Sequence, residues 1–156
     1  MRIVLALIIL ALLYLALVSP RLRKSGFASP ALLAHRGLFD NQNGATENSL
    51  AAFERAAAVG YAIELDVHLT ADGQLIVFHD EDLMRACGIA GDPRQMTLAQ
   101  LREQRLFGTD QRIPTLDEVL DLVDGRVTLL IELKTTSRYR ELPLAAMQRL
   151  RRYKGP

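Results

Sequence analysis

The chain has 156 residues, of which 49% are hydrophobic and 24% charged, and this balance is typical of a globular protein rather than a disordered one. The formal net charge of +1 lacks the basic excess of a surface that follows nucleic-acid phosphates, so nucleic acid is not an expected partner. The single cysteine, Cys87, excludes an intramolecular disulfide, and we expect it to act as a small buried hydrophobe.

An uncharged apolar stretch, residues 3–18, lies near the start and is followed by a basic cluster at residues 21–24. Its length is slightly below the ~20 residues that span a bilayer as a helix. A cleaved signal peptide is the competing interpretation, but residues 17–20 offer no small-residue cleavage site. We predict an uncleaved, single-pass membrane anchor, with the globular part on the cytoplasmic side because of the flanking positive charges. The prediction divides the chain into an anchor over residues 1–24, a linker over residues 25–30 and a globular domain over residues 31–156.

Short apolar and amphipathic segments alternate through the globular domain. An apolar strand is predicted over residues 31–34, and it is followed directly by the polar residues His35 and Arg36. After a polar loop, the cap-type residues 46–49 precede a predicted helix over residues 50–59. The glycine that comes next is a typical helix terminator.

Residues 61–80, YAIELDVHLTADGQLIVFHD, are predicted to form two short strands joined by an Asp-Gly turn. Strand alternation places Glu64, Asp66 and His68 on one face of the first strand. The second strand ends at His79. Two carboxylates on one strand face, with an imidazole at the end of the next strand, indicate a hard-cation site with an acid–base group beside it. His68 lies past the two carboxylates, so we expect it to be solvated rather than a ligand.

The rest of the chain continues the alternation of helices and strands. A glycine-containing loop is predicted first, and two helices then begin at capping boxes that start with Thr97 and Thr115. A fourth strand, residues 127–133, is apolar until Glu132. A final helix with a basic, solvated face is predicted over residues 144–153.

Near-continuous apolar strands separated by amphipathic helices indicate an α/β fold with a parallel sheet buried on both faces. In such folds the site lies at the carboxyl ends of the strands. Every predicted strand delivers polar groups at that end, namely His35 with Arg36, Glu64 with Asp66, His79, and Glu132 with Lys134. We therefore expect the functional site at this edge of the sheet.

Five stretches of the chain carry motifs in a fixed order: AHRG at residues 34–37, TENSLAAF at 46–53, IELDVHLTADGQLIVFHD at 63–80, IPTLDEVLDLV at 113–123 and IELK at 131–134. Together they resemble the glycerophosphodiester phosphodiesterase family, a group of TIM barrels. The resemblance covers roughly residues 32–134. It is specific because several motifs occur in order at sensible spacings, whereas any one of them alone is weak.

The resemblance implies hydrolysis of glycerophosphodiesters to an alcohol and glycerol 3-phosphate with a divalent cation, Ca²⁺ or Mg²⁺. The family's metal ligands fall by position on Glu64, Asp66 and Glu132. Its paired catalytic histidines fall on His35 and His79. The residues that hold the substrate phosphate or line the pocket fall on Arg36, Lys134 and Glu47.

The chemistry of a phosphodiester agrees with these assignments. The ester is anionic and unreactive, so catalysis has to neutralise charge on the phosphoryl oxygens and protonate the leaving alkoxide. A hard cation on carboxylate oxygens, with Arg36 and Lys134, achieves the first. Imidazole, whose unperturbed pKa is about 6.5, can serve as base or as acid at neutral pH, and the resemblance favours His35 as base and His79 as acid. The competing interpretation is that the carboxylates pair only with arginine or lysine, as Glu132 and Lys134 would with each other.

Length is where the chain departs from the family. A (β/α)₈ barrel needs about 250 residues, whereas this chain offers about four strand–helix units, a partial TIM (β/α)₈-type barrel with open strand edges. A fragment of a longer reading frame, self-association of two copies through these edges, and a degenerate remnant all account for the difference. Two alternative functions are a phospholipase-D-like hydrolysis of membrane lysophospholipids and a catalytically inactive, membrane-tethered half-barrel that binds a partner.

Overall fold

The computed structural model describes residues 8–11, 13–15, 32–134 and 140–155. The first two of these ranges are helical, and no helix among the described residues is both long and apolar enough to cross a membrane. Much of the predicted anchor and the whole of the predicted linker, residues 25–30, lie outside the described residues. Both stay predictions.

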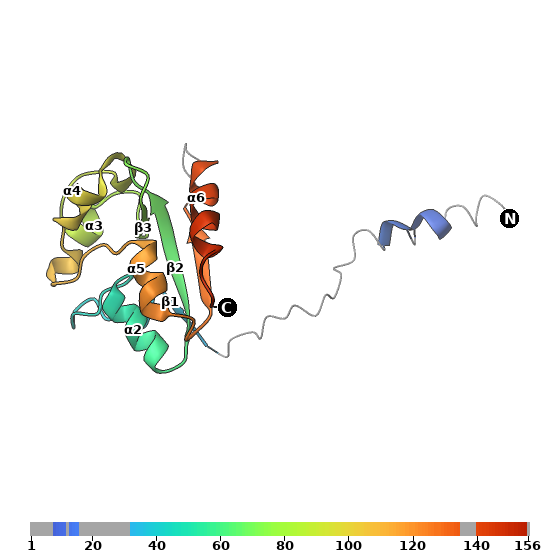
Figure 1. Ribbon diagram of the computed structural model, residues 1–156, viewed down its shortest axis with the longest axis horizontal. Coiled ribbons are helices and arrows are strands. Elements are labelled where there is room, and N and C mark those ends of the chain that lie inside the picture. Colours follow the sequence, from blue (N-terminus) through green and yellow to red (C-terminus); the bar gives the residue numbers. More distant parts are fainter. Residues whose placement is uncertain (1–7, 12, 16–31, 135–139, 156) are drawn as a thin grey trace.

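A four-stranded sheet runs through the globular part, with β2 (Ala62–Leu69) at its centre (Figure 1). Strands β1 (Leu33–His35) and β4 (Leu129–Leu133) both pair with β2 in parallel. Strand β3 (Leu75–Val77) pairs with β2 antiparallel. The α/β class and the parallel sheet are confirmed, but one of the predicted strands runs the other way. The cause is the short turn between β2 and β3, because parallel neighbours need a crossover of a dozen or more residues.

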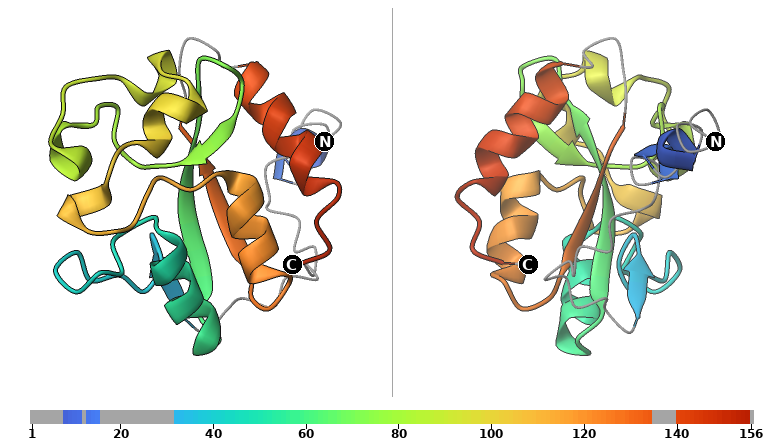
Figure 2. Two further views of the ribbon diagram at one scale, coloured as in Figure 1. Left: turned by 60° about the vertical axis from the view of Figure 1, so that its left-hand side comes forward. Right: turned by 90° about the vertical axis from the view of Figure 1, so that its right-hand side faces the viewer.

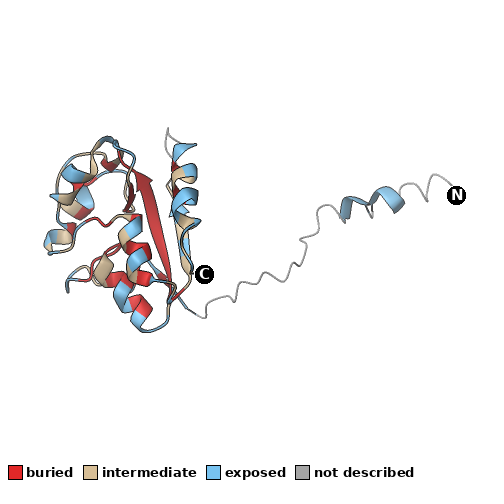
Figure 3. Ribbon diagram, in the orientation of Figure 1, coloured by how far each residue is buried: buried red, intermediate tan, exposed pale blue. Residues whose placement is uncertain are grey.

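Three helices cover one face of this sheet: α2 (Leu50–Ala58), α5 (Leu116–Val123) and α6 (Glu141–Leu150) (Figure 2). Their apolar residues pack with those of the strands into a first hydrophobic core, in which Leu65 of β2 is fully buried. Strand β2 is buried along its entire length (Figure 3), so its polar side chains are also withdrawn from solvent.

Side-chain caps determine where the helices begin, as the sequence predicts. Helix α4 (Leu98–Arg102) begins at a capping box formed by Thr97. Helix α5 begins at a second box, in which the hydroxyl of Thr115 accepts the Glu118 N–H at 3.2 Å and the Glu118 carboxylate accepts the Thr115 N–H at 2.8 Å. The hydroxyl of Ser49 caps α2. These caps satisfy N–H groups that the first turn of a helix leaves without partners.

Between β3 and α5 the chain makes an excursion, residues 78–113, around a second hydrophobic core. The excursion holds α4 together with α3 (Met84–Cys87), η1 (Pro93–Gln95) and η2 (Leu106–Gly108). The buried apolar residues of this second core are Ile76, Phe78, Leu83, Ala86, Leu101, Leu106 and Ile113. The short elements α3, η1 and η2 were not predicted, because so few residues carry no readable periodicity. The thiol of Cys87 packs against this core, and burial raises its pKa to about 11, which agrees with its expected role as a hydrophobe.

Helix α6 begins at Glu141 rather than at Leu144, and it ends at Leu150. Pro143 lies in its first turn, where the missing N–H of proline has no helical partner to lose. The predicted start at Leu144, after the proline, was wrong by one turn.

Strands β1 and β4 lie on either side of β2 in the described sheet. Leu33 on β1 is 47% exposed and Leu130 on β4 is 54% exposed. Self-association through these strands stays a prediction.

The tight packing of the turn after β1 against α2 gives a test of the fold. Gly37 has φ +84°, and a Cβ there would lie 2.9 Å from the carbonyl carbon and from the Cβ of Ala52. We expect Gly37→Ala to lower the free energy of unfolding by about 2–4 kcal/mol, from left-handed strain plus an overpacked helix contact. Urea denaturation followed by circular dichroism measures this loss.

Gly73→Ala is the matched control, because Gly73 has φ +77° but no heavy atom within 4 Å of the added Cβ. Its expected loss is about 1–2 kcal/mol, from strain alone. Equal losses in the two variants would contradict the steric argument.

Candidate metal and acid–base site

Three carboxylates converge where β2 and β4 run side by side. Glu64 and Asp66 lie on the same face of β2, and Asp66 is paired in register with Glu132 of β4. One oxygen of each carboxylate lies within 4.8 Å of an oxygen of the other two. Glu64 and Asp66 are buried and Glu132 is exposed. The structure therefore brings the three predicted metal ligands together.

Asp66 is fully buried, and polar side chains from three segments surround its carboxylate. The amide of Asn48 donates to Oδ2 at 2.9 Å, and Nε of Arg36 lies 3.6 Å from the same oxygen. Nζ of Lys134 lies 2.8 Å from Oδ1. Oδ1 nevertheless makes no hydrogen bond of normal geometry, so this buried oxygen has room for a further ligand.

The donor set fits a hard divalent cation. Carboxylate oxygens are the ligands that Ca²⁺ and Mg²⁺ prefer, at about 2.0–2.6 Å from the ion. Oxygens on opposite sides of such an ion are then about 4–5 Å apart, and the three oxygens here lie within 4.8 Å of one another. A cation held by Glu64, Asp66 and Glu132 would give Oδ1 of the buried Asp66 a ligand in addition to the Lys134 ammonium.

Lys134 lies between two of these carboxylates. Its ammonium donates to Oε1 of Glu132 at 2.8 Å and lies 2.8 Å from Oδ1 of Asp66. Burial lowers the pKa of Lys134, but the hydrogen bonds to Asp66 and Glu132 raise it, and the net direction is upward. The ammonium therefore stays charged at neutral pH. The pairing of Glu132 with Lys134, which the sequence left open as an alternative, exists alongside the carboxylate cluster.

Arg36 and Glu47 form a second charged group next to the first. Arg36 has a left-handed backbone, φ 60°, and its N–H donates to the carbonyl of Glu64 at 2.9 Å. Its guanidinium donates to Glu47 at 2.9 Å, and Asn41 donates to the same carboxylate at 3.3 Å. Arg85 adds two more hydrogen bonds to Glu47, at 2.6 and 3.0 Å. Burial raises the pKa of Glu47, but the hydrogen bonds together lower it by more, and the net direction is downward. This carboxylate therefore stays ionised at neutral pH.

The two predicted catalytic histidines lie beside the carboxylates. His35 is the last residue of β1, its side chain is 67% exposed, and its Nε2 lies 3.8 Å from Oε2 of Glu64. His79 follows β3, and its Nδ1 lies 2.6 Å from Oδ1 of Asp80. Because β3 folds back along β2, the residue before His79 donates its N–H to the carbonyl of Asp66 at 2.9 Å. The hairpin, rather than a parallel strand end, is what carries His79 to the site.

A pocket of about 320 Å³ opens beside these groups. It is lined by His68, His79, Asp80, Glu81, Arg94, Glu132, Leu133 and Lys134. One metal-ligand candidate and one acid–base candidate therefore share a single hollow. The other predicted site residues are not among those that line the pocket. They contact Lys134 or one another through hydrogen bonds and ion pairs.

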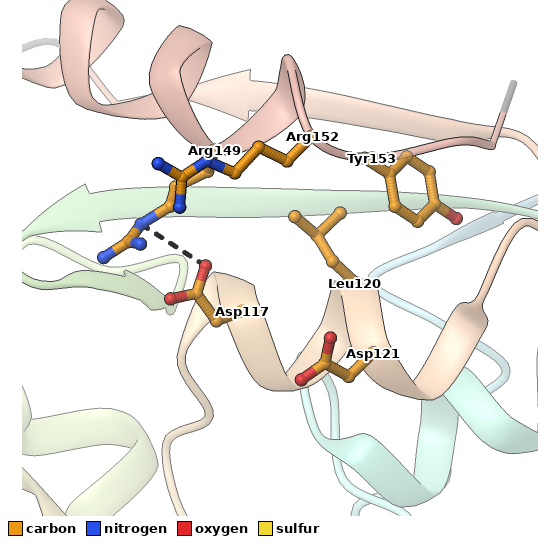
Figure 4. Close-up of a pocket in the computed structure, with 6 residues that line it drawn as sticks. All are labelled: Asp117, Leu120, Asp121, Arg149, Arg152 and Tyr153. Carbon is orange, nitrogen blue, oxygen red and sulfur yellow. Dashed lines mark ion pairs between the residues drawn. The ribbon is translucent and has the colours of Figure 1, made fainter.

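A separate hollow of about 290 Å³ lies between α5 and α6, outside this site (Figure 4). Its lining consists of Asp117, Leu120, Asp121, Arg149, Arg152 and Tyr153. Arg149 and Asp117 face each other across it as an ion pair at 3.4 Å. No residue is common to the linings of the two hollows.

His68 is buried, and the expectation that it is solvated was wrong. Only 1% of the residue is exposed, because β2 continues to Leu69 and His68 pairs with Ile76 of β3. Burial lowers its pKa, while a contact of 3.4 Å from Nε2 to the carbonyl oxygen of His79 raises it, and the net direction is downward. His68 is thus a neutral part of the pocket wall at pH 7.

Residues 35–152, which include the whole of this site, match the model of the Glycerophosphoryl diester phosphodiesterase family. The chain belongs to this family. The match confirms the resemblance that the ordered motifs indicate, and it extends past the last motif into α6.

Named relatives agree with the family assignment. A glycerophosphodiester phosphodiesterase of Caldanaerobacter subterraneus subsp. tengcongensis is 41% identical over 112 residues, which are 67% of this chain and 45% of that protein. Lysophospholipase D GDPD1 of Homo sapiens is 33% identical over 112 residues, which are 64% of this chain and 34% of that protein.

Solved structures of the family have the same fold over the shared part. A phosphodiesterase of Oleispira antarctica, in complex with the product sn-glycerol-3-phosphate, matches 81% of this chain and 53% of its own with a TM-score of 0.71 and 30% identity. A glycerophosphodiester phosphodiesterase of Thermotoga maritima matches 80% of this chain and 50% of its own with a TM-score of 0.66 and 35% identity. The chain thus spans less than half the length of the curated relatives and about half that of the solved structures.

Sequence reasoning missed the roles of three residues in this family member. Asn48, which donates to Asp66, lies in the run of cap-type residues and was interpreted only as part of that cap. Asp80 stands next to His79, and this adjacency was the available signal for their hydrogen bond. Arg85 gave no local signal, because its contact with Glu47 joins residues 38 positions apart.

The lowered pKa of Glu47 predicts a pH-dependent contribution to stability. Such a contribution is fully present above the unfolded pKa of about 4.3 and is lost as the pH falls through the folded value. We expect Glu47→Gln to be less stable than the wild type by about 1–3 kcal/mol at pH 7, since two arginines lose their anionic partner. The difference is expected to shrink as the pH falls below about 4. Urea denaturation at several pH values measures it.

Glu103→Gln is a suitable control, because Glu103 is exposed and its substitution is expected to change stability by less than about 0.5 kcal/mol. A difference between the wild type and Glu47→Gln that persists unchanged in acid would contradict the charge network.

Proposed function

We propose that this chain hydrolyses glycerophosphodiesters to an alcohol and glycerol 3-phosphate with a divalent cation, Ca²⁺ or Mg²⁺. The observation that carries the proposal is the convergence of three carboxylates within 4.8 Å, beside a pocket shared by His79, Glu132 and Lys134. The names of the curated relatives support the reaction, and the product bound to the Oleispira antarctica enzyme supports its outcome. The parallel strands and the helices that follow them suit a partial (β/α)₈-type barrel, as the resemblance implies.

The charges of the site suit an anionic substrate. Glu64, Asp66 and Glu132 would hold the cation, which when bound neutralises charge on the phosphoryl oxygens. Lys134 lines the pocket and stays charged, so it adds a second positive group that can contact the same oxygens. Arg36 is not among the residues that line the pocket, and its guanidinium is already bonded to Glu47.

The two histidines would move the protons. A water molecule attacks the phosphorus and gives a proton to His35, the base, which is mostly exposed at the end of β1. His79 then donates a proton to the leaving alkoxide as the P–O bond breaks. The carboxylate of Asp80 accepts a hydrogen bond from Nδ1 of His79, which leaves Nε2 as the nitrogen that exchanges the proton.

Release of glycerol 3-phosphate from glycerophosphocholine tests this proposal. The wild-type chain is expected to release it with added Ca²⁺ or Mg²⁺ and to stop when a chelator is present. His79→Asn is expected to lower kcat by about 10²- to 10⁴-fold, the usual contribution of a general acid. In Glu64→Gln with Asp66→Asn, the remaining rate is expected not to respond to added cation.

The matched control is Glu54→Gln, which removes an exposed carboxylate that pairs with Arg126 away from the site. Metal-dependent turnover that persists in the Glu64→Gln, Asp66→Asn variant would contradict the assigned ligands. Failure of the wild-type chain to release product with either cation would contradict the reaction.

A second candidate is the phospholipase-D-like hydrolysis of membrane lysophospholipids by the same groups. Two observations favour it. Relatives in rat, human and mouse, 33–34% identical, bear the name lysophospholipase D GDPD1. The uncharged apolar stretch over residues 3–18, with the basic cluster after it, supports a membrane anchor that would hold the site close to such lipids.

Comparison of two substrates separates the candidates. If the chain acts on membrane lipids, it is expected to hydrolyse micellar lysophosphatidylcholine at least about tenfold faster, by kcat/KM, than soluble glycerophosphocholine, because remote binding of the acyl chain adds to the apparent affinity. Choline release measures both reactions. A preference for the soluble diester would contradict the lipid candidate and leave the first proposal in place.

A further inference from the structure

Five charged or ionisable side chains form an unbroken series of contacts beside the pocket, in the order Arg36, Glu47, Arg85, Asp80 and His79. Arg36 donates to Glu47 at 2.9 Å, and Nδ1 of His79 lies 2.6 Å from Asp80. Arg85 joins the two halves of the series. It therefore links the segment that follows β1 to the segment that follows β3.

Arg85 is held by four hydrogen bonds to two carboxylates. Its NH1 and NH2 groups donate to Glu47 at 3.0 and 2.6 Å, while its Nε and NH2 donate to Asp80 at 2.7 and 3.0 Å. Both carboxylates thus receive paired bonds from the planar fork of one guanidinium, which fixes their relative orientation as well as their charge. A lysine ammonium cannot reproduce this geometry.

The excursion places Arg85 for this contact. Arg85 lies on α3, and its guanidinium carbon lies 5.3 Å from the centre of the Phe107 ring of η2. Phe107 has φ 51°, a left-handed backbone that bulky residues rarely adopt. Its ring packs against the second core, so the excursion holds this strained residue against the guanidinium.

Asp80 in turn determines the state of the His79 ring. An ionised carboxylate only accepts hydrogen bonds, so the proton in the 2.6 Å contact belongs to Nδ1 of His79. Burial raises the pKa of Asp80, the bonds from Arg85 and His79 lower it, and the net direction is downward. Asp80 therefore remains an acceptor at neutral pH.

We propose that Arg85 is a positioning residue for the phosphodiesterase reaction: by fixing Asp80 between Glu47 and His79, it holds the Nδ1–H of the His79 imidazolium on Asp80, so that Nε2–H is the proton donor toward the substrate. This inference rests on the proposed function, in which His79 protonates the leaving alkoxide. Arg85 itself touches neither the metal-ligand candidates nor the reacting atoms. Its effect is expected to pass entirely through Asp80 and the ring of His79.

The first test varies the leaving group. From a glycerophosphodiester of p-nitrophenol, the p-nitrophenolate leaves without protonation. From glycerophosphocholine, the choline alkoxide needs the proton from His79. Arg85→Ala is expected to lower kcat on glycerophosphocholine by about 10- to 100-fold, the usual effect of removing a group that orients a catalytic residue, and to change kcat on the nitrophenyl ester by less than about threefold. Arg85→Lys is expected to recover little of the loss, because it restores the charge without the fork.

Arg105→Ala is the matched control. Arg105 is 45% exposed and Arg85 is 47% exposed, and each bonds an aspartate five positions away in the excursion, Asp110 and Asp80 respectively. It is expected to turn over both esters like the wild type. Equal losses on the two esters in Arg85→Ala would overturn the inference, because that result means general damage to the site.

The second test needs no activity. In ¹⁵N-labelled chain, at a pH where the His79 ring has lost its second proton, the ring nitrogens of His79 are expected to show the Nδ1–H tautomer in the wild type and in Arg105→Ala. In Arg85→Ala the Nε2–H tautomer is expected to become populated. An unchanged His79 tautomer in Arg85→Ala would overturn the inference even if the wild type proves inactive, whereas an inactive wild type with the expected tautomer shift would contradict only the proposed function.

Discussion

Burying a carboxylate at the centre of a sheet costs several kcal/mol of folding free energy unless charges and donors surround it. Asp66 is such a carboxylate. Asn48, Lys134 and Arg36 supply the surrounding groups from three different segments. Two of them, Arg36 and Asn48, have left-handed backbones, with φ 60° and 54°. Such strain persists only where the surrounding structure enforces it. The polar arrangement at the ends of β1, β2 and β4 is therefore built around one negative charge.

The two hydrophobic cores explain how this arrangement is kept rigid. The first core fixes β2 against three helices, and the second organises the excursion. Strand β3 belongs to both, since Leu75 and Val77 pack in the first core while Ile76, together with Phe78 just after the strand, packs in the second. His79 follows Phe78, the first residue beyond the end of this strand. A side chain at the junction of two packed layers has little freedom to move, which suits a group that must meet a substrate in one orientation.

The sequence predicts the centre of the site better than its surroundings. Strand alternation is enough to place Glu64 and Asp66 on one face, and the capping boxes at Thr97 and Thr115 are local signals that locate two helix starts. The burial of His68 was not predictable in this way, because it depends on the hairpin partner and on the excursion.

Arg85 shows the same limit more strongly. Its role depends on Glu47, a residue 38 positions away, and nothing in the pattern around Arg85 records that contact. The start of α6 was missed for a different reason, since Pro143 is tolerated in a first turn but reads as a helix breaker. Interactions within a few residues of each other are thus readable directly, whereas the convergence of Glu64 and Asp66 with the distant Glu132 on one metal site was expected only from the family resemblance, which gave no such guide to Arg85.

The account depends on Glu64, Asp66 and Glu132 sharing one ion, and diffraction from crystals of the chain grown with Mn²⁺ tests this directly. Manganese prefers the same oxygen ligands and gives an anomalous signal that locates it without reference to the protein. The predicted result is one peak about 2.0–2.6 Å from an oxygen of each of the three carboxylates. A peak that does not touch Asp66, or Lys134 remaining as the sole partner of its Oδ1 at saturating Mn²⁺, would contradict the account.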